Sequence, residues 1–227
     1  MTAAVVTVSG GLDSVTLAHD LAAAGHDLTL VSFDYGQRHV RELACAAACA
    51  ERLGAAYHPV DLRSVGALLT GSALTDRGVA VPDGHYTDES MRDTVVPNRN
   101  AIMLSVATGV AVATGADIVA AAVHAGDHPI YPDCRPAFVS AFEQMARVAN
   151  EGFVAPGFRV VTPYLDWDKS DIVARGAELG VPFAETWSCY KGGDVHCGTC
   201  GTCVERIEAF SLAGVPDPTS YAAAVGT

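Results

Sequence analysis

The feature that most constrains this chain is a glycine turn close to its start. An apolar run, AAVVTV, leads into SGGLDS at 9–14, and helix-forming residues follow directly. Two adjacent glycines allow positive φ and close approach of the backbone, so that successive N–H groups can surround an anion. The N-terminus of the following helix points at the same place. The sequence therefore predicts a strand, turn and helix that bind an anionic ligand.

Strands and helices continue to alternate along the chain. Further apolar strands are expected at 27–35, 55–62, 117–123 and 158–165. Helices are expected at 14–24, 38–53, 100–114, 135–150, 169–179 and 204–213. Strands that alternate with helices of this length form parallel βαβ units. We therefore expect an α/β fold with a doubly wound, mostly parallel, Rossmann-like sheet.

The chain of 227 residues is long enough for one large domain but short for two. We expect residues 1–227 to form a single domain that includes a cysteine-rich loop and helix at 186–213. Residues 66–94 are rich in Gly, Asp and Pro. This segment is expected to be partly irregular and to form a mobile flap near the site.

Composition and charge exclude several classes of protein. The chain carries 26 acidic and 14 basic residues, a formal net charge of −12, and it lacks the basic cluster typical of proteins that bind long nucleic acids. No apolar run reaches the ~18–20 residues of a membrane span, and the start has no basic segment typical of a signal peptide. We expect a cytoplasmic protein that binds neither nucleic acid nor membrane.

The glycine turn differs from two common nucleotide-binding motifs. It lacks the lysine of the Walker motif GxxxxGK[ST], and it does not read GxGxxG. Ser9 and Ser14 add hydroxyl groups, and a carboxylate oxygen of Asp13 can hold Mg²⁺. A βα turn without a ligand is the alternative, but a strand, SGGxDS and a helix in succession form a more specific pattern than that.

SGGLDS resembles the PP-loop of the ATP pyrophosphatases that share the adenine-nucleotide α-hydrolase-like fold. The resemblance implies that the terminal phosphates of ATP are bound and that the α-phosphorus is attacked, with release of pyrophosphate. It assigns ATP and Mg²⁺ to the turn residues Ser9, Gly10, Gly11, Leu12, Asp13 and Ser14.

Seven cysteines are present, and four of them lie within fifteen residues: Cys189, Cys197, Cys200 and Cys203. Gly198 and Gly201 permit tight turns, so that the thiolates can converge on one point. A Cys₄ set without an open position favours structural Zn²⁺; an iron–sulfur cluster is the alternative, and free thiols are less consistent with the pattern. His196 is expected to be a solvated neighbour of the site. Cys45 and Cys49 are expected to pack in the core.

Further motifs follow in order along the chain. They are FDYGQRH at 33–39, VPNRN at 96–100, HAGDHPIYPDCRP at 124–136, TPYLDWDKSDIV at 162–173 and SCYKGGDVHCGTCGTC at 188–203. Together with SGGLDS they closely resemble the 7-cyano-7-deazaguanine synthase family, and the resemblance covers essentially the whole chain. This combination is more specific than a PP-loop alone, which occurs in many activities.

The resemblance implies an ATP-dependent ligase that converts 7-carboxy-7-deazaguanine and ammonia to the nitrile, for queuosine or deazapurine biosynthesis. A carboxylate is a poor electrophile, and adenylation turns its oxygen into a good leaving group for attack by ammonia. A second adenylation, on the amide oxygen, allows elimination to the nitrile, so two ATP are consumed. The resemblance also implies a homodimer, and the chemistry depends mainly on positioning and charge stabilisation.

Residue roles follow from the motifs. The catalytic candidates are Asp13, Arg99, Asp127 and Lys169. Arg38 and Arg99 can bind phosphate or the substrate carboxylate, since a guanidinium matches both, and Arg38 is assigned to ATP; the alternative for both is a solvated surface position. The substrate-binding candidates are Arg99, Asn100, Asp127, Asp133 and Arg135, with the carboxylates facing the guanine-like edge.

Lys169 can neutralise charge on the adenylate or simply begin a helix. Cys134 is a nucleophile or a packed thiol.

Three other interpretations stay open. The segment DHPIYPDC differs from many family members, which have Ser-Gly before the Tyr, so a diverged member that stops at the amide is one alternative. A PP-loop tRNA thiolase is a second alternative, although it would need a basic RNA-binding face. A nucleotide sensor without catalysis, in which zinc only braces the fold, is the third.

Overall fold

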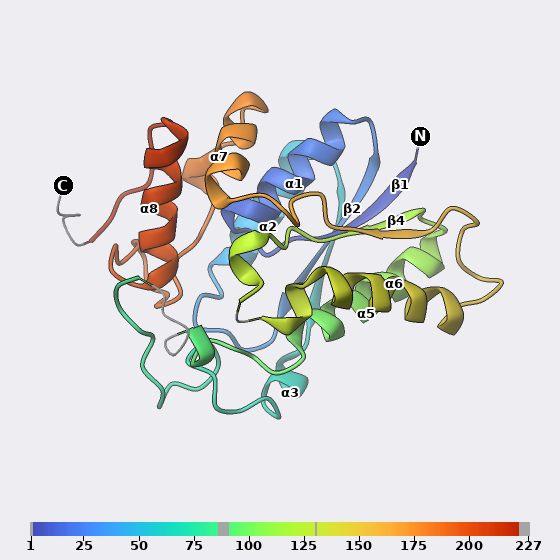
Figure 1. The fold of residues 1–227 in the computed structure, drawn as a ribbon, viewed down its shortest axis with the longest axis horizontal. Helices are drawn as coiled ribbons and strands as arrows, with labels where there is room; N and C mark the ends of the chain where they lie inside the picture. Colours follow the sequence, from blue (N-terminus) through green and yellow to red (C-terminus); the bar gives the residue numbers. More distant parts are fainter. Residues whose placement is uncertain (1, 86–90, 130, 223–227) are drawn as a thin grey trace.

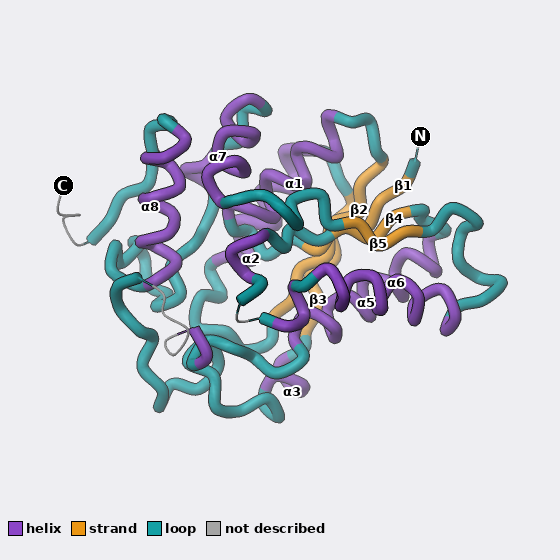
Figure 2. The backbone as a smooth tube through the Cα atoms, in the orientation of Figure 1, coloured by secondary structure: helices purple, strands orange, loops and turns teal. Residues whose placement is uncertain are grey.

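The computed structural model describes residues 2–85, 91–129 and 131–222. A parallel β-sheet forms its centre (Figure 2). The strands are β1 (Ala3–Thr7), β2 (Asp27–Asp34), β3 (Ala56–Asp61), β4 (Ile118–Ala120) and β5 (Arg159–Val161). Their order across the sheet is β3-β2-β1-β4-β5, and every pairing is parallel. The chain therefore reverses its direction of winding between β1 and β4, which confirms the doubly wound fold.

Helices cover both faces of the sheet. The longer ones are α1 (Leu12–Ala23), α2 (Glu42–Leu53), α5 (Arg99–Thr114), α6 (Pro136–Ala149), α7 (Lys169–Glu178) and α8 (Gly201–Ala213). The shorter ones are α3 (Arg63–Gly66) and the 3₁₀ turns η1 (Ala125–Asp127), η2 (Pro132–Cys134) and η3 (Phe183–Glu185). Figure 1 shows α1 and α7 on one face and α5 and α6 on the other.

Alternating residues of β1 divide the core between the two faces. Ala4 and Val6 belong to the apolar cluster that includes side chains of α1, α2, α7 and α8. Val5 belongs to the second cluster, with side chains of α5 and α6. Successive side chains of a strand point to opposite faces, so a central parallel strand is apolar throughout. This explains why AAVVTV is apolar at every position except Thr7.

The start of α2 differs from the prediction. A helix is expected from residue 38, but residues 38–41 form turns and α2 begins at Glu42. The guanidinium of Arg38 donates to the carbonyl oxygens of Asp76 and Val79, so its backbone follows the neighbouring loop instead of the helix. α2 ends as expected at Gly54, whose φ of 62° is the left-handed conformation that glycine favours.

The predicted flap is only partly described. Residues 67–85 are mostly turns and bends, as expected of a Gly- and Pro-rich segment. Residues 86–90 of the flap, and Ile130 of the HAGDHPIYPDCRP segment, lie outside the described residues. Among the helices in the described ranges, none combines the length and the apolar character that crossing a bilayer requires.

A buried arginine joins the cysteine-rich segment to the rest of the fold. Arg206 in α8 is 1% exposed. Its guanidinium donates to the Thr186 hydroxyl at 2.8 Å and to the Phe183 carbonyl at 3.0 Å, and it lies 3.4 Å from a carboxylate oxygen of Asp217. A buried guanidinium needs such partners for its N–H groups. α8 is thereby fastened both to the loop after α7 and to the C-terminal tail.

We expect Gly176→Ala to destabilise the fold, because Gly176 is where α7 approaches α1 closely. An added Cβ would lie 2.5 Å from the Phe183 ring and 2.9 Å from the Thr16 hydroxyl. Overpacking of this kind costs about 1–3 kcal/mol in the free energy of unfolding, which urea titration measures.

The control is Gly109→Ala in α5. Gly109 is exposed and has nothing within 4 Å of an added Cβ. This change should leave the free energy of unfolding unchanged or raise it by about 0.5–1 kcal/mol. Equal effects at the two positions would contradict the packing that we describe.

Candidate functional site

A cavity of about 250 Å³ opens at the carboxyl ends of β1, β2 and β4. Its walls come from the glycine turn, from the segments that follow β2 and β4, from the start of α5, from Lys169 and from α8. In doubly wound sheets, ligands bind outside the carboxyl ends of the strands, where the strand order reverses. The cavity lies at this position, beside the β1–β4 reversal.

The glycine turn forms one wall of the cavity through Ser9 and residues 11–14. Gly10 has φ of 94°, and a Cβ there would lie 2.0 Å from the carbonyl oxygen of Glu42, so glycine is required. The hydroxyls of Ser9 and Ser14 lie 3.1 Å apart, and the Ser9 hydroxyl accepts the Gly11 N–H. These bonds fix the turn in the shape that points α1 at the cavity.

The first turn of α1 is suited to an anion. α1 begins at Leu12, and its N-cap Gly11 provides no side-chain hydrogen bond. The first N–H groups of a helix lack partners within the helix and carry a partial positive charge. An anion in the cavity would meet these groups, as the sequence predicts.

Asp13 and Lys169 meet beside the glycine turn. Asp13 Oδ1 is buried and has no hydrogen-bond partner among the described residues, whereas Oδ2 lies 3.7 Å from Lys169 Nζ. Lys169 Nζ also donates to Glu205 Oε2 at 3.0 Å. Burial lowers the pKa of Lys169, but the carboxylates of Asp13 and Glu205 outweigh burial and hold that pKa above its usual value. Lys169 therefore carries a full positive charge at the wall of the cavity.

Glu205 is a site residue that our sequence analysis missed. It lies in α8, two residues beyond the last clustered cysteine, and it lines the cavity together with Thr202 and Arg206. It enters the site because α8 packs against α7, a contact between helices that no local motif predicts.

Arg99 supplies a second positive charge. It begins α5, lines the cavity and bonds to the side chain of Tyr35. Tyr131 also lines the cavity, and its hydroxyl is bonded to that of Thr94 at 2.6 Å. A guanidinium in this position can bind a carboxylate or phosphate with two parallel hydrogen bonds.

Asn100 and Asp127 also line the cavity. Asp127 lies in η1, where its carboxylate accepts the His124 backbone N–H at 3.2 Å. His124 Nδ1 in turn accepts the Gly126 N–H at 3.1 Å. These two reciprocal bonds hold the Asp127 carboxylate at the rim of the site.

Besides Gly10, three predicted site residues do not line the cavity. Asp133 accepts the Asn100 backbone N–H at 3.0 Å and so holds the start of α5. Arg135 donates to the carbonyls of His128 and Pro129. Arg38 is engaged with the 76–79 loop, as described above. All three are bonded to backbone groups of the segments around the cavity, and these bonds explain why their side chains do not line it.

Cys134 is a packed thiol in the described structure. It is 3% exposed, and its Sγ accepts from the Asn100 side-chain amide at 3.1 Å. Burial raises the pKa of this thiol well above its usual value. The thiolate needed for a nucleophile is therefore disfavoured.

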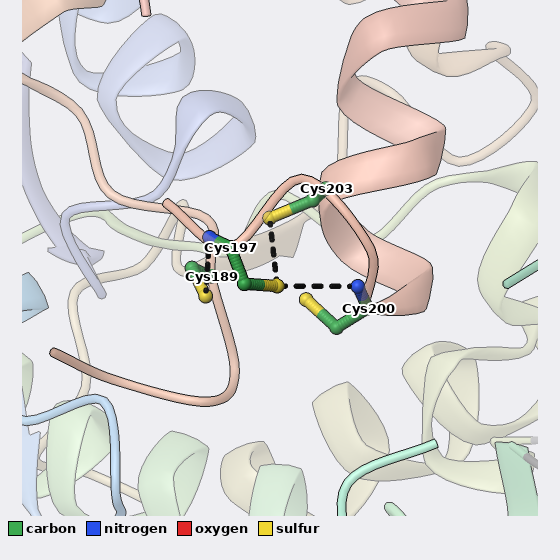
Figure 3. A group of neighbouring side chains, drawn as sticks. All are labelled: Cys189, Cys197, Cys200 and Cys203. Atoms are coloured by element: carbon green, nitrogen blue, oxygen red, sulfur yellow. Dashed lines mark hydrogen bonds between the residues drawn. The ribbon is translucent and has the colours of Figure 1, made fainter. Parts of the chain in front are cut away.

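The four clustered cysteines converge on one point (Figure 3). Their Sγ atoms all lie within 4.8 Å of one another, and the Sγ atoms of Cys197 and Cys203 are 3.8 Å apart. A regular tetrahedron with ~2.3 Å metal–sulfur bonds has edges of about 3.8 Å. The cluster therefore has the composition and dimensions of a tetrahedral metal site.

Backbone N–H groups point at the sulfur atoms of this cluster. The Cys200 N–H donates to Cys197 Sγ at 3.2 Å, and the Cys197 N–H donates to Cys189 Sγ at 3.4 Å (Figure 3). The Thr199 N–H also donates to Cys197 Sγ, at 3.4 Å. Such bonds favour the thiolate form that metals bind.

His196 is buried, although it is expected to be solvated, and it is not part of the cysteine cluster. Its Nε2 accepts the Ser188 N–H at 3.0 Å, and its ring packs against Trp187 with centroids 4.2 Å apart. Burial lowers the pKa of His196 to about 4, so the ring is neutral.

The doubly wound sheet, the glycine turn at its reversal point and the attached tetracysteine site define an α/β protein of the PP-loop class. The family model described as "Queuosine biosynthesis protein QueC" matches residues 3–214. The chain belongs to this family.

Curated relatives agree over nearly the same length. A 7-cyano-7-deazaguanine synthase of Paracoccus denitrificans is 63% identical over 217 residues, which cover 96% of this chain and 92% of that protein. The synthase of Rhizobium johnstonii is 60% identical over 96% of this chain and 91% of that protein. The synthase of Brucella ovis is 62% identical over 95% of this chain and 92% of that protein.

We expect Cys200→Ser to remove the metal and to destabilise the protein. The four sulfur atoms share one site, and metal binding to such a site contributes directly to folding. The loss should be about 3 kcal/mol or more in the free energy of unfolding. Elemental analysis of the purified protein and urea titration measure the two effects.

Cys45→Ser is the matched control, because Cys45 lies in α2 outside the cluster. It should retain the metal of the unaltered protein. An unaltered protein that binds no metal after exposure to Zn²⁺ under reducing conditions would contradict our interpretation of the cluster.

Proposed function

We propose that this chain is an ATP-dependent ligase that converts 7-carboxy-7-deazaguanine and ammonia to 7-cyano-7-deazaguanine, for queuosine or deazapurine biosynthesis. The observation that carries the proposal is the convergence of the glycine turn, Lys169 and Arg99 on one cavity. This arrangement occurs in a chain about 60% identical to proteins named for that synthesis.

In this proposal, the phosphates of ATP lie against the glycine turn and the N-terminus of α1. Ser9, Gly11, Leu12 and Ser14 hold them, and Gly10 lets the turn take its shape. The positive charge of Lys169 stabilises the charge that develops as the α-phosphorus is attacked. Asp13 would hold Mg²⁺ through Oδ1, whose buried and unpartnered state fits a cation. Bound there, Mg²⁺ would offset the charge of the pyrophosphate leaving group.

The acid substrate lies at the other side of the site. Arg99 orients its carboxylate, and Asp127 and Asn100 face the guanine-like edge, where a carboxylate can accept from N–H donors. Asp133 and Arg135 then act by holding the loops that carry these groups, and Arg38 acts in the same way on the 76–79 loop. Orientation of the two reactants is the main contribution that we assign to these side chains.

The tetracysteine site is proposed to hold Zn²⁺. Its four thiolates leave no open position for a substrate, as in structural zinc sites. Its function is to hold the first turn of α8, the helix that carries Glu205 and Arg206 to the cavity.

We further propose one domain at 1–227, with its metal-binding segment at 186–213, acting as a cytoplasmic homodimer. Met145 and Val148 of α6 and the following Phe153 are 47%, 71% and 77% exposed, which supports a self-association surface there. The unpaired cysteines fit a reducing compartment.

Products of the purified protein test the proposal. Incubation with ATP, Mg²⁺, ammonium and 7-carboxy-7-deazaguanine should give the nitrile, AMP and pyrophosphate, as measured by mass spectrometry. Amide without nitrile would identify the diverged member considered above. Absence of turnover with ATP still bound would overturn the proposal in favour of a nucleotide sensor.

Asp13→Asn should lower the rate in this assay roughly 100-fold or more, because it removes the carboxylate charge that would hold Mg²⁺. The control is Asp27→Asn, which alters an exposed carboxylate at the amino end of β2. The cavity lies at the carboxyl ends of the strands, so this change should leave the rate unchanged. Equal rates for the two variants would contradict the role that we assign to Asp13.

A further inference from the structure

A carboxyl group with no role so far lines the same cavity. Glu42 is the first residue of α2, and its side chain is only 10% exposed. Its carbonyl oxygen occupies the space next to Gly10 that a Cβ would need. Glu42 therefore lies directly against the turn that we assign to the phosphates of ATP.

The carboxyl group is held by an oriented amide. Gln37 Oε1 accepts the Tyr35 N–H at 2.9 Å, and its Nε2 donates to the Phe33 carbonyl at 2.9 Å. These bonds fix which way the amide faces, and its Nε2 also donates to Glu42 Oε1 at 3.0 Å. His39 Nε2 lies 3.5 Å from the same oxygen. Such buried, oriented networks are typical of positions where one side-chain geometry matters.

The environment of Glu42 suits proton exchange near neutral pH. Burial raises the pKa of Glu42 to about 8, although the hydrogen bond from Gln37 and the charge of Arg99 lower it. His39 contributes no charge, because burial lowers its pKa to about 3. The groups that interact with Glu42 are thus the Gln37 amide, the neutral His39 imidazole, the Tyr35 phenol, the Arg99 guanidinium and the Cys45 thiol. An acid or base is most effective when its pKa lies near the working pH.

The proposed reaction needs a proton acceptor at nitrogen in both of its stages. Ammonium predominates over ammonia at neutral pH and must lose a proton before its lone pair can attack the adenylated carboxyl carbon. The C–N bond then forms, the C–O bond to AMP breaks, and nitrogen loses a second proton to leave the amide. In the second stage, the adenylated amide loses its two remaining N–H protons as its C–O bond to AMP breaks, which leaves the nitrile.

We propose that Glu42 is the base that accepts these protons from nitrogen, first from ammonium and then from the intermediates. The inference rests on the proposed function. Arg99 assists, because a nearby guanidinium disfavours a second cation and so promotes loss of a proton from ammonium, while its charge keeps Glu42 available as the carboxylate. Each proton passes from Glu42 to water before the next transfer.

Glu42→Gln tests the role with little change of shape, since glutamine is isosteric with the protonated carboxyl group. Adenylation alone is measured by exchange of labelled pyrophosphate into ATP that depends on the acid substrate. Glu42→Gln should keep this exchange within a few-fold of the unaltered protein. Ammonium-dependent formation of amide and nitrile should fall roughly 100-fold or more.

A change of nucleophile gives the decisive measurement. Hydroxylamine is largely unprotonated at neutral pH and needs no base to free its lone pair. Glu42→Gln should therefore form the hydroxamate from hydroxylamine at close to the rate of the unaltered protein. Glu42→Asp, which keeps a base but shortens its reach, should use ammonium at an intermediate rate. Glu51→Gln, an exposed carboxylate on the same helix, should behave as the unaltered protein does.

Several results would overturn the role of Glu42. Loss of pyrophosphate exchange in a variant with an unchanged melting temperature would place Glu42 at ATP or its metal ion. Unchanged use of ammonium, or loss of hydroxamate in step with amide, would remove it from proton transfer. Absence of exchange in the unaltered protein is a different result, which would remove the proposed function and the role of Glu42 with it.

Discussion

The contact between Gly10 and the first turn of α2 is the constraint on which the rest of the site depends. A Cβ at Gly10 would lie 2.0 Å from the Glu42 carbonyl oxygen, so no other residue allows the turn and the helix to lie this close. This contact brings the Gln37–Glu42 pair beside the glycine turn that lines the cavity. The glycine at position 10 thus has two separate causes: a positive φ, and closeness of the backbone to a second helix.

Local sequence patterns predicted most of the fold. The alternation of apolar runs with helix-forming segments was enough to predict a doubly wound parallel sheet, and glycines such as Gly54 marked helix ends correctly. The errors lie where tertiary contacts override local preference. α2 begins later than expected because Arg38 is bonded to a loop almost forty residues away in sequence. The strands β4 and β5 are shorter than the apolar segments that contain them.

The sequence motifs predicted which residues are candidates for the site, but not which of their side chains contact one another. The glycine turn, Arg99, Lys169 and the cysteine cluster each stand out by residue type and spacing. Glu205 does not stand out, because its role depends on how α8 packs against α7. Arg135 carries a charge typical of substrate binding, yet backbone carbonyls engage it. Residue type predicts what a side chain can bind, whereas only packing decides which partner it meets.

The position of α8 determines how oxidation of the clustered cysteines would affect the cavity. The helix starts at the tetracysteine cluster and, one turn later, presents Glu205 to Lys169 at 3.0 Å. The first turn of α8 thus connects the cysteine cluster rigidly to this ion pair. Oxidation of the thiolates would free this turn of α8 and separate Glu205 from Lys169. Asp13 would then be the carboxylate nearest to Lys169. Oxidation of cysteines that lie outside the cavity would then change the local charge beside the glycine turn.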